Sequence, residues 1–194
     1  RTLTGPGAGT PMAFSPDGRT LSTAEDGGNV TLWDVEEGVT TETLEGHADD
    51  ANEHAFSPDG RTLYTAGDDG RVIIWDVSGD RRLGRPFRTG NRDEGGAEAS
   101  SPQFALSPDG RALAVARLDG RVELIDAETL RRTASFEAFP ARSAVAIDYS
   151  ADGRRLAVAG GGGGVGVWDV ESGERLGALL RAPRGRRTLN QRTV

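Results

Sequence analysis

The phrase FSPDGRTL occupies residues 14–21 of this chain and returns unchanged at residues 56–63. Two close variants follow it, LSPDGRAL at residues 106–113 and YSADGRRL at residues 149–156. The four copies begin 42, 50 and 43 residues apart. Self-similarity at such a period indicates an array of structural repeats rather than one irregular domain.

A second phrase follows the first at a fixed distance. It reads LWDV at 32–35, IWDV at 74–77, LIDA at 124–127 and VWDV at 167–170. Each copy begins 18 residues after the first phrase of its unit begins. Two markers that keep one register through four units define four repeats of the same kind.

Each repeat predicts four short antiparallel strands joined by tight turns. Within Ser-Pro-Asp-Gly, proline fixes φ at about −65°, aspartate can bond to its own backbone and glycine accepts a left-handed conformation, so this phrase predicts a hairpin turn. Glycine-bearing pairs such as Asp69-Gly70 and Ser172-Gly173 predict the later turns of each unit. The four sheets are expected within residues 10–46, 52–89, 102–138 and 144–182.

Two stretches lie outside this pattern. The segment GNRDEGGAEASS at Gly90–Ser101 is polar and rich in glycine, so it is expected to form a mobile surface loop between the second and third units. A tolerated insertion and a functional loop both remain open for it. Residues 1–5, RTLTG, align with the end of an outer strand, so the chain is expected to be an excerpt that begins inside a preceding unit of a longer protein.

In register and motif, the chain resembles the WD-repeat β-propeller family over nearly its whole length. The resemblance implies an all-β fold in which residues 1–194 form a propeller, or part of one, from four-stranded antiparallel blades. Members of the family more usually close with seven or eight blades. Four units therefore imply either further blades or the pairing of two copies into an eight-bladed ring.

The resemblance also implies a hydrogen-bonded tetrad inside a blade, made by a histidine, a serine or threonine, an aspartate and the tryptophan of the third strand. Only the second unit matches, with His47, Thr65, Asp69 and Trp75. A histidine linked to an aspartate and a hydroxyl also resembles a catalytic relay, but a structural network is the favoured interpretation. The other units lack part of the set, so we expect apolar packing to hold them together.

Composition disfavours several kinds of function. The net charge of −7, from 23 basic and 30 acidic residues, disfavours binding to nucleic acid. Cysteine is absent and the two histidines, His47 and His54, are isolated from further ligands, so no metal or other cofactor is expected. No apolar run reaches the roughly 20 residues of a membrane span. A cytoplasmic location without membrane contact is therefore expected.

Residue usage predicts where the chain comes from. All 23 basic residues are arginine, which we interpret as codon bias in a GC-rich genome, so a bacterial and actinobacterial source is predicted. Bacterial chains of this kind often join such repeats to signalling ATPases, kinases or transcription regulators. By that analogy the chain is predicted to be a scaffold or sensor module of a larger regulatory protein.

The function that the resemblance implies is noncatalytic binding of a protein partner. In the family, the face with the Gly-His and Asp-Gly loops often binds partners. The alternative is a propeller enzyme of the hydrolase or lactonase type that uses the central channel, for which the innermost strands offer Glu53, His54, Gln103 and Asp148. By register, the candidate partner-binding residues are Glu25, Asp26, Asp49, Asp50, Asn52, Asp68, Arg92, Asp93, Glu94, Arg117, Leu118 and Arg142.

Overall fold

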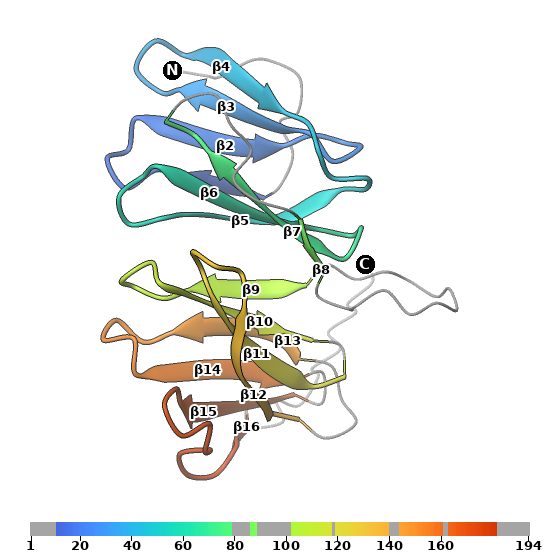
Figure 1. The fold of residues 1–194 in the computed structure, drawn as a ribbon, viewed down its shortest axis with the longest axis vertical. Coiled ribbons are helices and arrows are strands. Elements are labelled where there is room, and N and C mark those ends of the chain that lie inside the picture. The colour runs from blue at the N-terminus through green and yellow to red at the C-terminus, as the bar shows by residue number, and fades with distance from the viewer. Residues whose placement is uncertain are drawn as a thin grey trace, which may run out of the picture.

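The computed structural model describes residues 11–78, 86–88, 102–117, 119–139, 144–160 and 163–181. These residues form four antiparallel sheets of four strands each, with no helix among them (Figure 1). The predicted all-β fold of four-stranded antiparallel blades is thereby confirmed. The sheets are called blades 1 to 4, in chain order.

The strands of every blade pair in chain order, so that each neighbour is reached by a hairpin. Blade 1 consists of β1 (Met12–Phe14), β2 (Thr20–Ala24), β3 (Val30–Asp34) and β4 (Val39–Leu44), and blade 2 of β5 (Ala51–Phe56), β6 (Thr62–Gly67), β7 (Arg71–Asp76) and β8 (Phe87–Arg88). Blade 3 consists of β9 (Gln103–Leu106), β10 (Ala112–Ala116), β11 (Arg121–Asp126) and β12 (Arg132–Glu137), and blade 4 of β13 (Ala144–Tyr149), β14 (Arg155–Gly160), β15 (Gly164–Asp169) and β16 (Leu180–Arg181).

The outer strands differ most from the sequence expectation. In blade 4 the expected outer strand is reduced to β16 and an isolated bridge between Trp168 and Arg175. Gly177 lies between them with φ at 77°, a conformation that interrupts an extended ladder. In blade 2 only β8 represents the expected outer strand within the described residues.

The repeated serine-to-glycine phrase closes the same hairpin turn in every blade. In blade 1, Ser15 Oγ donates a hydrogen bond of 2.7 Å to Asp17 Oδ1 and accepts one of 2.9 Å from the N–H of Thr20. Hydrogen bonds from Ser15 and from the N–H of Arg19 lower the pKa of Asp17 below its ordinary value. The turn is therefore specified locally, and its serine-to-aspartate bond recurs at Ser57, Ser107 and Ser150.

These turns also lie against one another in a row. The glycine of one turn faces the proline of the turn before it: a Cβ on Gly60 would lie 3.4 Å from Pro16 Cδ, and a Cβ on Gly110 would lie 2.7 Å from Pro58 Cδ. Both glycines have a positive φ, near 70°. Glycine is required here for its conformation and, at Gly110, for the close approach of the preceding blade.

Three apolar cores lie between the blades, and all share a common set of register positions. Where two blades meet, the blade that comes first in the chain contributes an alanine, a valine and a leucine or isoleucine. The blade that follows contributes a leucine and a large residue of its third strand. Val30 of blade 1, for example, shares a core with Leu63 and Trp75 of blade 2. We call the side of a blade that packs on the next blade its leading face, and the opposite side its trailing face. The leading faces contribute Ala24, Val30 and Leu32 in blade 1, Ala66, Val72 and Ile74 in blade 2, and Ala116, Val122 and Leu124 in blade 3.

The four blades form an open arc. Contacts join the innermost strands in sequence, β1 with β5, β5 with β9 and β9 with β13, whereas within the described ranges blade 1 has no comparable contact with blade 4. The outer strands β4 and β16 lie at opposite ends of the long axis, with β8 and β12 between them (Figure 1). The leading face of blade 4 and the trailing face of blade 1 therefore lie at the two ends of the arc.

Replacing Gly110 with alanine is expected to destabilise the protein more than replacing Gly18 with alanine. Both glycines have φ near 70°, so both substitutions incur left-handed strain on the order of 1 kcal/mol. Only the Gly110 methyl meets Pro58, which adds roughly 1–3 kcal/mol of overpacking, because nothing lies within 4 Å of a Cβ on Gly18. Urea unfolding of the two variants measures the difference, and equal free energies of unfolding would show that the turns do not depend on one another.

Candidate functional site

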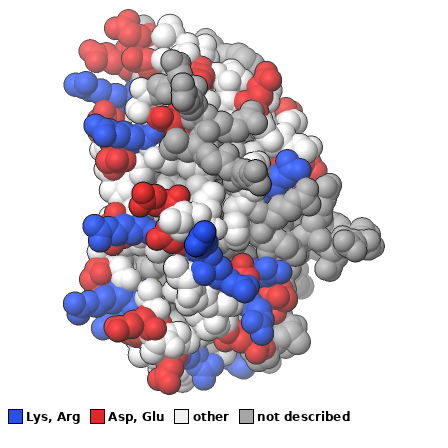
Figure 2. Space-filling view, viewed as in Figure 1, with Lys and Arg blue, Asp and Glu red and all other residues white. Residues whose placement is uncertain are grey.

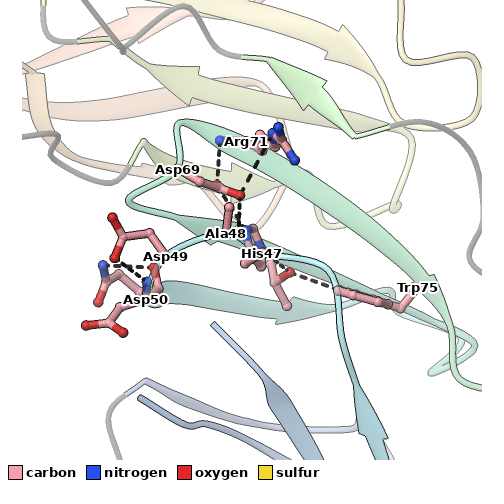
Figure 3. Close-up of polar contacts among 9 residues, drawn as sticks. His47, Ala48, Asp49, Asp50, Asp69, Arg71 and Trp75 are labelled. Atoms are coloured by element: carbon pink, nitrogen blue, oxygen red, sulfur yellow. Dashed lines mark hydrogen bonds and ion pairs between the residues drawn. The ribbon is translucent and has the colours of Figure 1, made fainter. Parts of the chain in front are cut away.

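A hydrogen-bonded network ties the segment before β5 to β6, the β6–β7 turn and β7 of blade 2 (Figure 3). His47 precedes β5, Thr65 lies on β6, Asp69 lies in the β6–β7 turn and Trp75 lies on β7. His47 Nδ1 lies 3.0 Å from Asp69 Oδ1, and His47 Nε2 lies 2.8 Å from Thr65 Oγ1. Trp75 Nε1 donates to the same Thr65 oxygen at 2.9 Å.

One set of proton positions satisfies this network. The indole of Trp75 can only donate and the carboxylate of Asp69 can only accept, so with a neutral ring His47 Nε2 accepts the hydrogen of Thr65 Oγ1. His47 Nδ1–H then donates to Asp69. Burial alone would raise the pKa of Asp69, but hydrogen bonds from His47 and from the backbone of Ala48 and Arg71 outweigh burial and lower it.

Blades 1 and 4 have different internal contacts from those of blade 2. Blade 1 keeps one bond of the network, from Trp33 Nε1 to Thr23 Oγ1 at 2.9 Å. In blade 4 the ring of Trp168 packs against Phe139 at 5.6 Å between centroids, and Gly166 leaves room for that indole. Blade 1 thus retains a polar contact of this network, whereas the contacts of Trp168 in blade 4 are apolar.

Blade 3 contains a charged cluster that the sequence reasoning missed. Glu123 on β11 is buried and accepts hydrogen bonds from Arg117 Nη1 at 3.2 Å and Arg132 Nη1 at 3.1 Å. The register of the repeats could have revealed this cluster, because Glu123 occupies the position that Thr31 has on β3 and Ile73 has on β7. A carboxylate at a buried strand position requires cationic partners, which the two arginines supply.

The loops that precede β3, β5 and β7 meet at one end of blades 1 and 2. The N–H of Gly27 donates to Asp50 Oδ1 at 2.9 Å, which joins the β2–β3 turn of blade 1 to the segment before β5. The N–H of Asp68 donates to the carbonyl of Asp50 at 2.9 Å, and Ala48 N–H donates to Asp69 Oδ2 at 3.0 Å. The buried network of blade 2 therefore fixes loops that reach across to blade 1.

The candidate residues of these two blades lie at this loop end, which we call the loop face. Asp26, Asp49 and Asp50 are exposed there. Asp49 and Asp50 lie apart from the buried His47–Trp75 network (Figure 3). The half-buried candidates beside them are Glu25, which accepts a hydrogen bond from Thr31, together with Asn52 and Asp68.

The remaining candidates are not brought into this group. Arg117 lies in blade 3, where its guanidinium is engaged by Glu123 and lies 3.6 Å from Asp119. The other five, Arg92, Asp93, Glu94, Leu118 and Arg142, lie outside the described residues, as do the whole of the expected loop at 90–101 and residues 1–5.

The opposite end of the blades carries both signs of charge. The Ser-Pro-Asp-Gly turns of blades 1 to 3 and the Ser-Ala-Asp-Gly turn of blade 4 place an aspartate beside an exposed arginine, as in Asp17 and Arg19 or Asp59 and Arg61. Basic and acidic groups alternate down this edge of the molecule (Figure 2). The loop face of blades 1 and 2 instead combines Asp26, Asp49 and Asp50 without a matching series of exposed arginines among the described residues.

His54 is packed between blades 1 and 2 and does not line the channel. Its ring is buried, and Nδ1 lies 3.1 Å from Ser22 Oγ of blade 1. Nε2 has no hydrogen-bond partner among the described residues. Burial, followed by the nearby ring of His47, lowers the pKa of His54 to about 4, so the ring is neutral at neutral pH.

The innermost strands line a cavity of about 500 Å³. Glu53 and Asp148 both contribute to it, together with apolar residues such as Phe56 and Phe104. Burial raises the pKa of Glu53. No group of three or more histidine and carboxylate side chains in the described ranges could hold a metal ion. The same part of the chain contains no helix that could span a membrane.

Comparison with known proteins bears on the first two blades. The family model described as "WD domain, G-beta repeat" matches residues 12–34 and 38–76. These residues include β1 to β7, the His47–Trp75 network and most of the loop face. No curated protein matches the chain significantly.

Replacing Thr65 with valine is expected to cost more stability than replacing Thr23 with valine. Thr65 serves both His47 and Trp75, whereas Thr23 serves Trp33 alone, and both threonines are buried. Each buried hydrogen bond lost is worth on the order of 1–3 kcal/mol. Thermal and urea unfolding compare the variants, and equal losses would mean that His47 contributes nothing through Thr65.

Stability is expected to fall as the pH falls from 6.5 toward 4. The pKa of His54 is about 4 in the folded chain against an ordinary value of 6.5, so the unfolded chain binds more protons in this window. Between pH 7 and pH 5 the loss attributable to this ring is roughly 2 kcal/mol.

The control for this test is His54→Met, which places in blade 2 the residue that blade 1 has at the corresponding position, Met12. All other titrating groups are common to both proteins. Urea unfolding at pH 7 and pH 5 should show a smaller pH dependence for the variant. An unchanged dependence would show that His54 does not titrate in this range on unfolding.

Proposed function

We propose that this chain, which belongs to the WD-repeat family, is a noncatalytic scaffold that binds a protein partner through the loop face of blades 1 and 2. The observation that carries the proposal is the bond from Gly27 to Asp50, which joins the loops of two blades into one surface. A surface that is already ordered loses little conformational entropy when it binds.

Its charge indicates the kind of partner. Exposed carboxylates of Asp26, Asp49 and Asp50 favour a partner whose contacting surface is basic, because complementary charge accelerates encounter and selects among partners. Regulation of a larger bacterial protein by such binding, in the cytoplasm, is part of the same proposal. A further copy of the chain is the second proposed partner, and its contact lies at the ends of the arc rather than on the loop face.

The geometry supports the enzyme alternative less well. Of its four candidate groups, His54 packs against Ser22 of blade 1. Glu53 and Asp148 line the cavity beside the innermost strands with apolar neighbours, without a histidine or arginine among its described lining residues. We therefore propose binding rather than hydrolysis as the activity of the chain.

Site-specific crosslinking tests the proposed face. A photo-reactive residue at position 49, on the loop face, should capture the partner from cells of the source organism, whereas one at Glu37, exposed in the β3–β4 turn at the opposite end, should not. For a partner identified in this way, Asp26→Arg with Asp49→Arg should weaken binding at least about tenfold, because like charges would then face each other. Capture mainly from position 37, or unchanged affinity, would contradict the assignment of this face.

A further inference from the structure

A cavity of about 670 Å³ lies between blades 2 and 3, at the end of the blades opposite to the loop face. Blade 2 lines it with Thr62 and Tyr64 of β6 and Ile74 of β7, and blade 3 lines it with residues of the turns after β9 and β11. Both blades contact a neighbouring blade on each side, so the cavity depends on neither end of the arc. Its volume is that of a site for a small ligand or a single side chain.

The repeat itself shows why the boundary between blades 2 and 3 is hollow. In every blade, the residue after the third-strand aspartate donates its N–H to the carbonyl of the arginine that follows the first turn, so these four positions correspond. The residue is valine at Val35, Val77 and Val170 but alanine at Ala127. Val77 and Val170 pack against the apolar cores of their own boundaries. Blade 3 therefore lacks two methyl groups at a place that blades 2 and 4 fill.

Leu130, which lines the same cavity, has an unusual backbone conformation. Its φ of 56° is in the left-handed region, which Gly38 and Gly173 adopt at the same position of blades 1 and 4. Among the described residues, no other non-glycine residue has a positive φ. The leucine side chain packs against the core between blades 2 and 3 and gives the cavity an apolar wall that glycine would not supply. Strained positions of this kind cluster at sites that hold ligands.

Tyr64 is the buried polar group of the cavity. It is only 4% exposed, and blades 1 and 3 have the smaller Ser22 and Ala114 at the same register position. Its hydroxyl makes no hydrogen bond with the described residues, so it is available to a group that enters the cavity. Burial, followed by the carboxylate of Asp59, raises the pKa of Tyr64, so the phenol stays uncharged at neutral pH.

The lining residues carry more negative than positive charge. Asp126 Oδ1 accepts hydrogen bonds of 2.7 Å from both the N–H and the hydroxyl of Thr129, whereas Oδ2 has no partner among the described residues. These bonds lower the pKa of Asp126, so its carboxylate stays ionised. Glu128 is exposed beside it, and Arg111 is the basic residue among the described lining residues. Two carboxylates and one guanidinium favour a cationic ligand.

We propose that this cavity binds an arginine side chain of a protein partner. A guanidinium has five donors in one plane, and acceptors for it are present on Thr62, Tyr64 and Asp126. The aliphatic stem of an arginine fits against the apolar side chains of Ile74 and Leu130. Lysine has a compact ammonium group and cannot reach several separate acceptors in this way. The site is a contact beyond the loop face, at the other end of the blades.

Nuclear magnetic resonance titration of the isotope-labelled 194-residue chain tests the proposal. The probe is N-acetyl-arginine methylamide, and the matched neutral probe of the same shape is N-acetyl-citrulline methylamide. The arginine probe should bind with a roughly millimolar dissociation constant, because a single side chain supplies the contacts. The citrulline probe should bind about tenfold more weakly, because hydrogen bonds from a charged donor are stronger. Amide shifts at Tyr64 and Leu130 should report the binding.

Five variants assign the binding to this cavity. Ala127→Val introduces the residue of the other blades and should raise the dissociation constant of the arginine probe at least about tenfold by filling the space. Tyr64→Phe removes one hydroxyl and Glu128→Gln one charge, and each should raise the constant about threefold. Arg111→Gln removes a like charge and should lower the constant about twofold. Glu171→Gln, at the position of Glu128 in blade 4, is the matched control and should bind as the wild type does.

Several results would overturn the proposal. These are no shift with the arginine probe, equal binding of the two probes, and an unchanged constant in an Ala127→Val protein whose melting curve shows that it is folded. Tighter binding after Glu128→Gln together with weaker binding after Arg111→Gln would show that the cavity selects anions instead. None of these results alters the crosslinking expected at position 49, because the loop face lies at the other end of the blades.

Discussion

The packing of one blade on the next is the interaction on which this structure depends. A four-stranded sheet of short strands has two faces, and neither is covered by its own hairpins. The valine and alanine on the leading faces of blades 1 to 3 are buried because the leucine and large third-strand residue of the following blade lie against them. Because burial of apolar area is the main source of folding free energy, each blade is stable only in a row.

Within that row, buried polar groups determine how firmly the loops of a blade are held. In blade 2 the chain from Trp75 through Thr65 and His47 to Asp69 fixes the loops before β5 and β7. Fully satisfied buried networks of this kind restrict the conformations of the backbone that carries them. The loop face is consequently most rigid where its carboxylates are exposed, which suits a surface that recognises a partner without rearranging.

Blade 3 has different residues at the positions that form the polar network of blade 2. Its β10 and β11 replace the threonine and tryptophan by Val115 and Ile125, and its polar contacts move to Glu123 and its two arginines. Arg117 is a candidate partner-binding residue by sequence, but its interaction with buried Glu123 gives it a structural role. A residue at a loop register position is therefore not free for binding until its intramolecular partners are known.

The sequence by itself determined the number of blades, their strand order and the position of every Ser-Pro-Asp-Gly turn. It could do so because those turns are closed by bonds between residues two to five positions apart, such as Ser15 with Asp17 and Thr20. The members of the blade 2 network could also be named, since one repeat contains them all. Only the tertiary structure decided that Asp50 reaches Gly27, that His54 faces Ser22 and that Glu123 is buried between arginines. The first two features depend on which blade lies beside which, and such contacts between distant residues are set by packing rather than by local sequence.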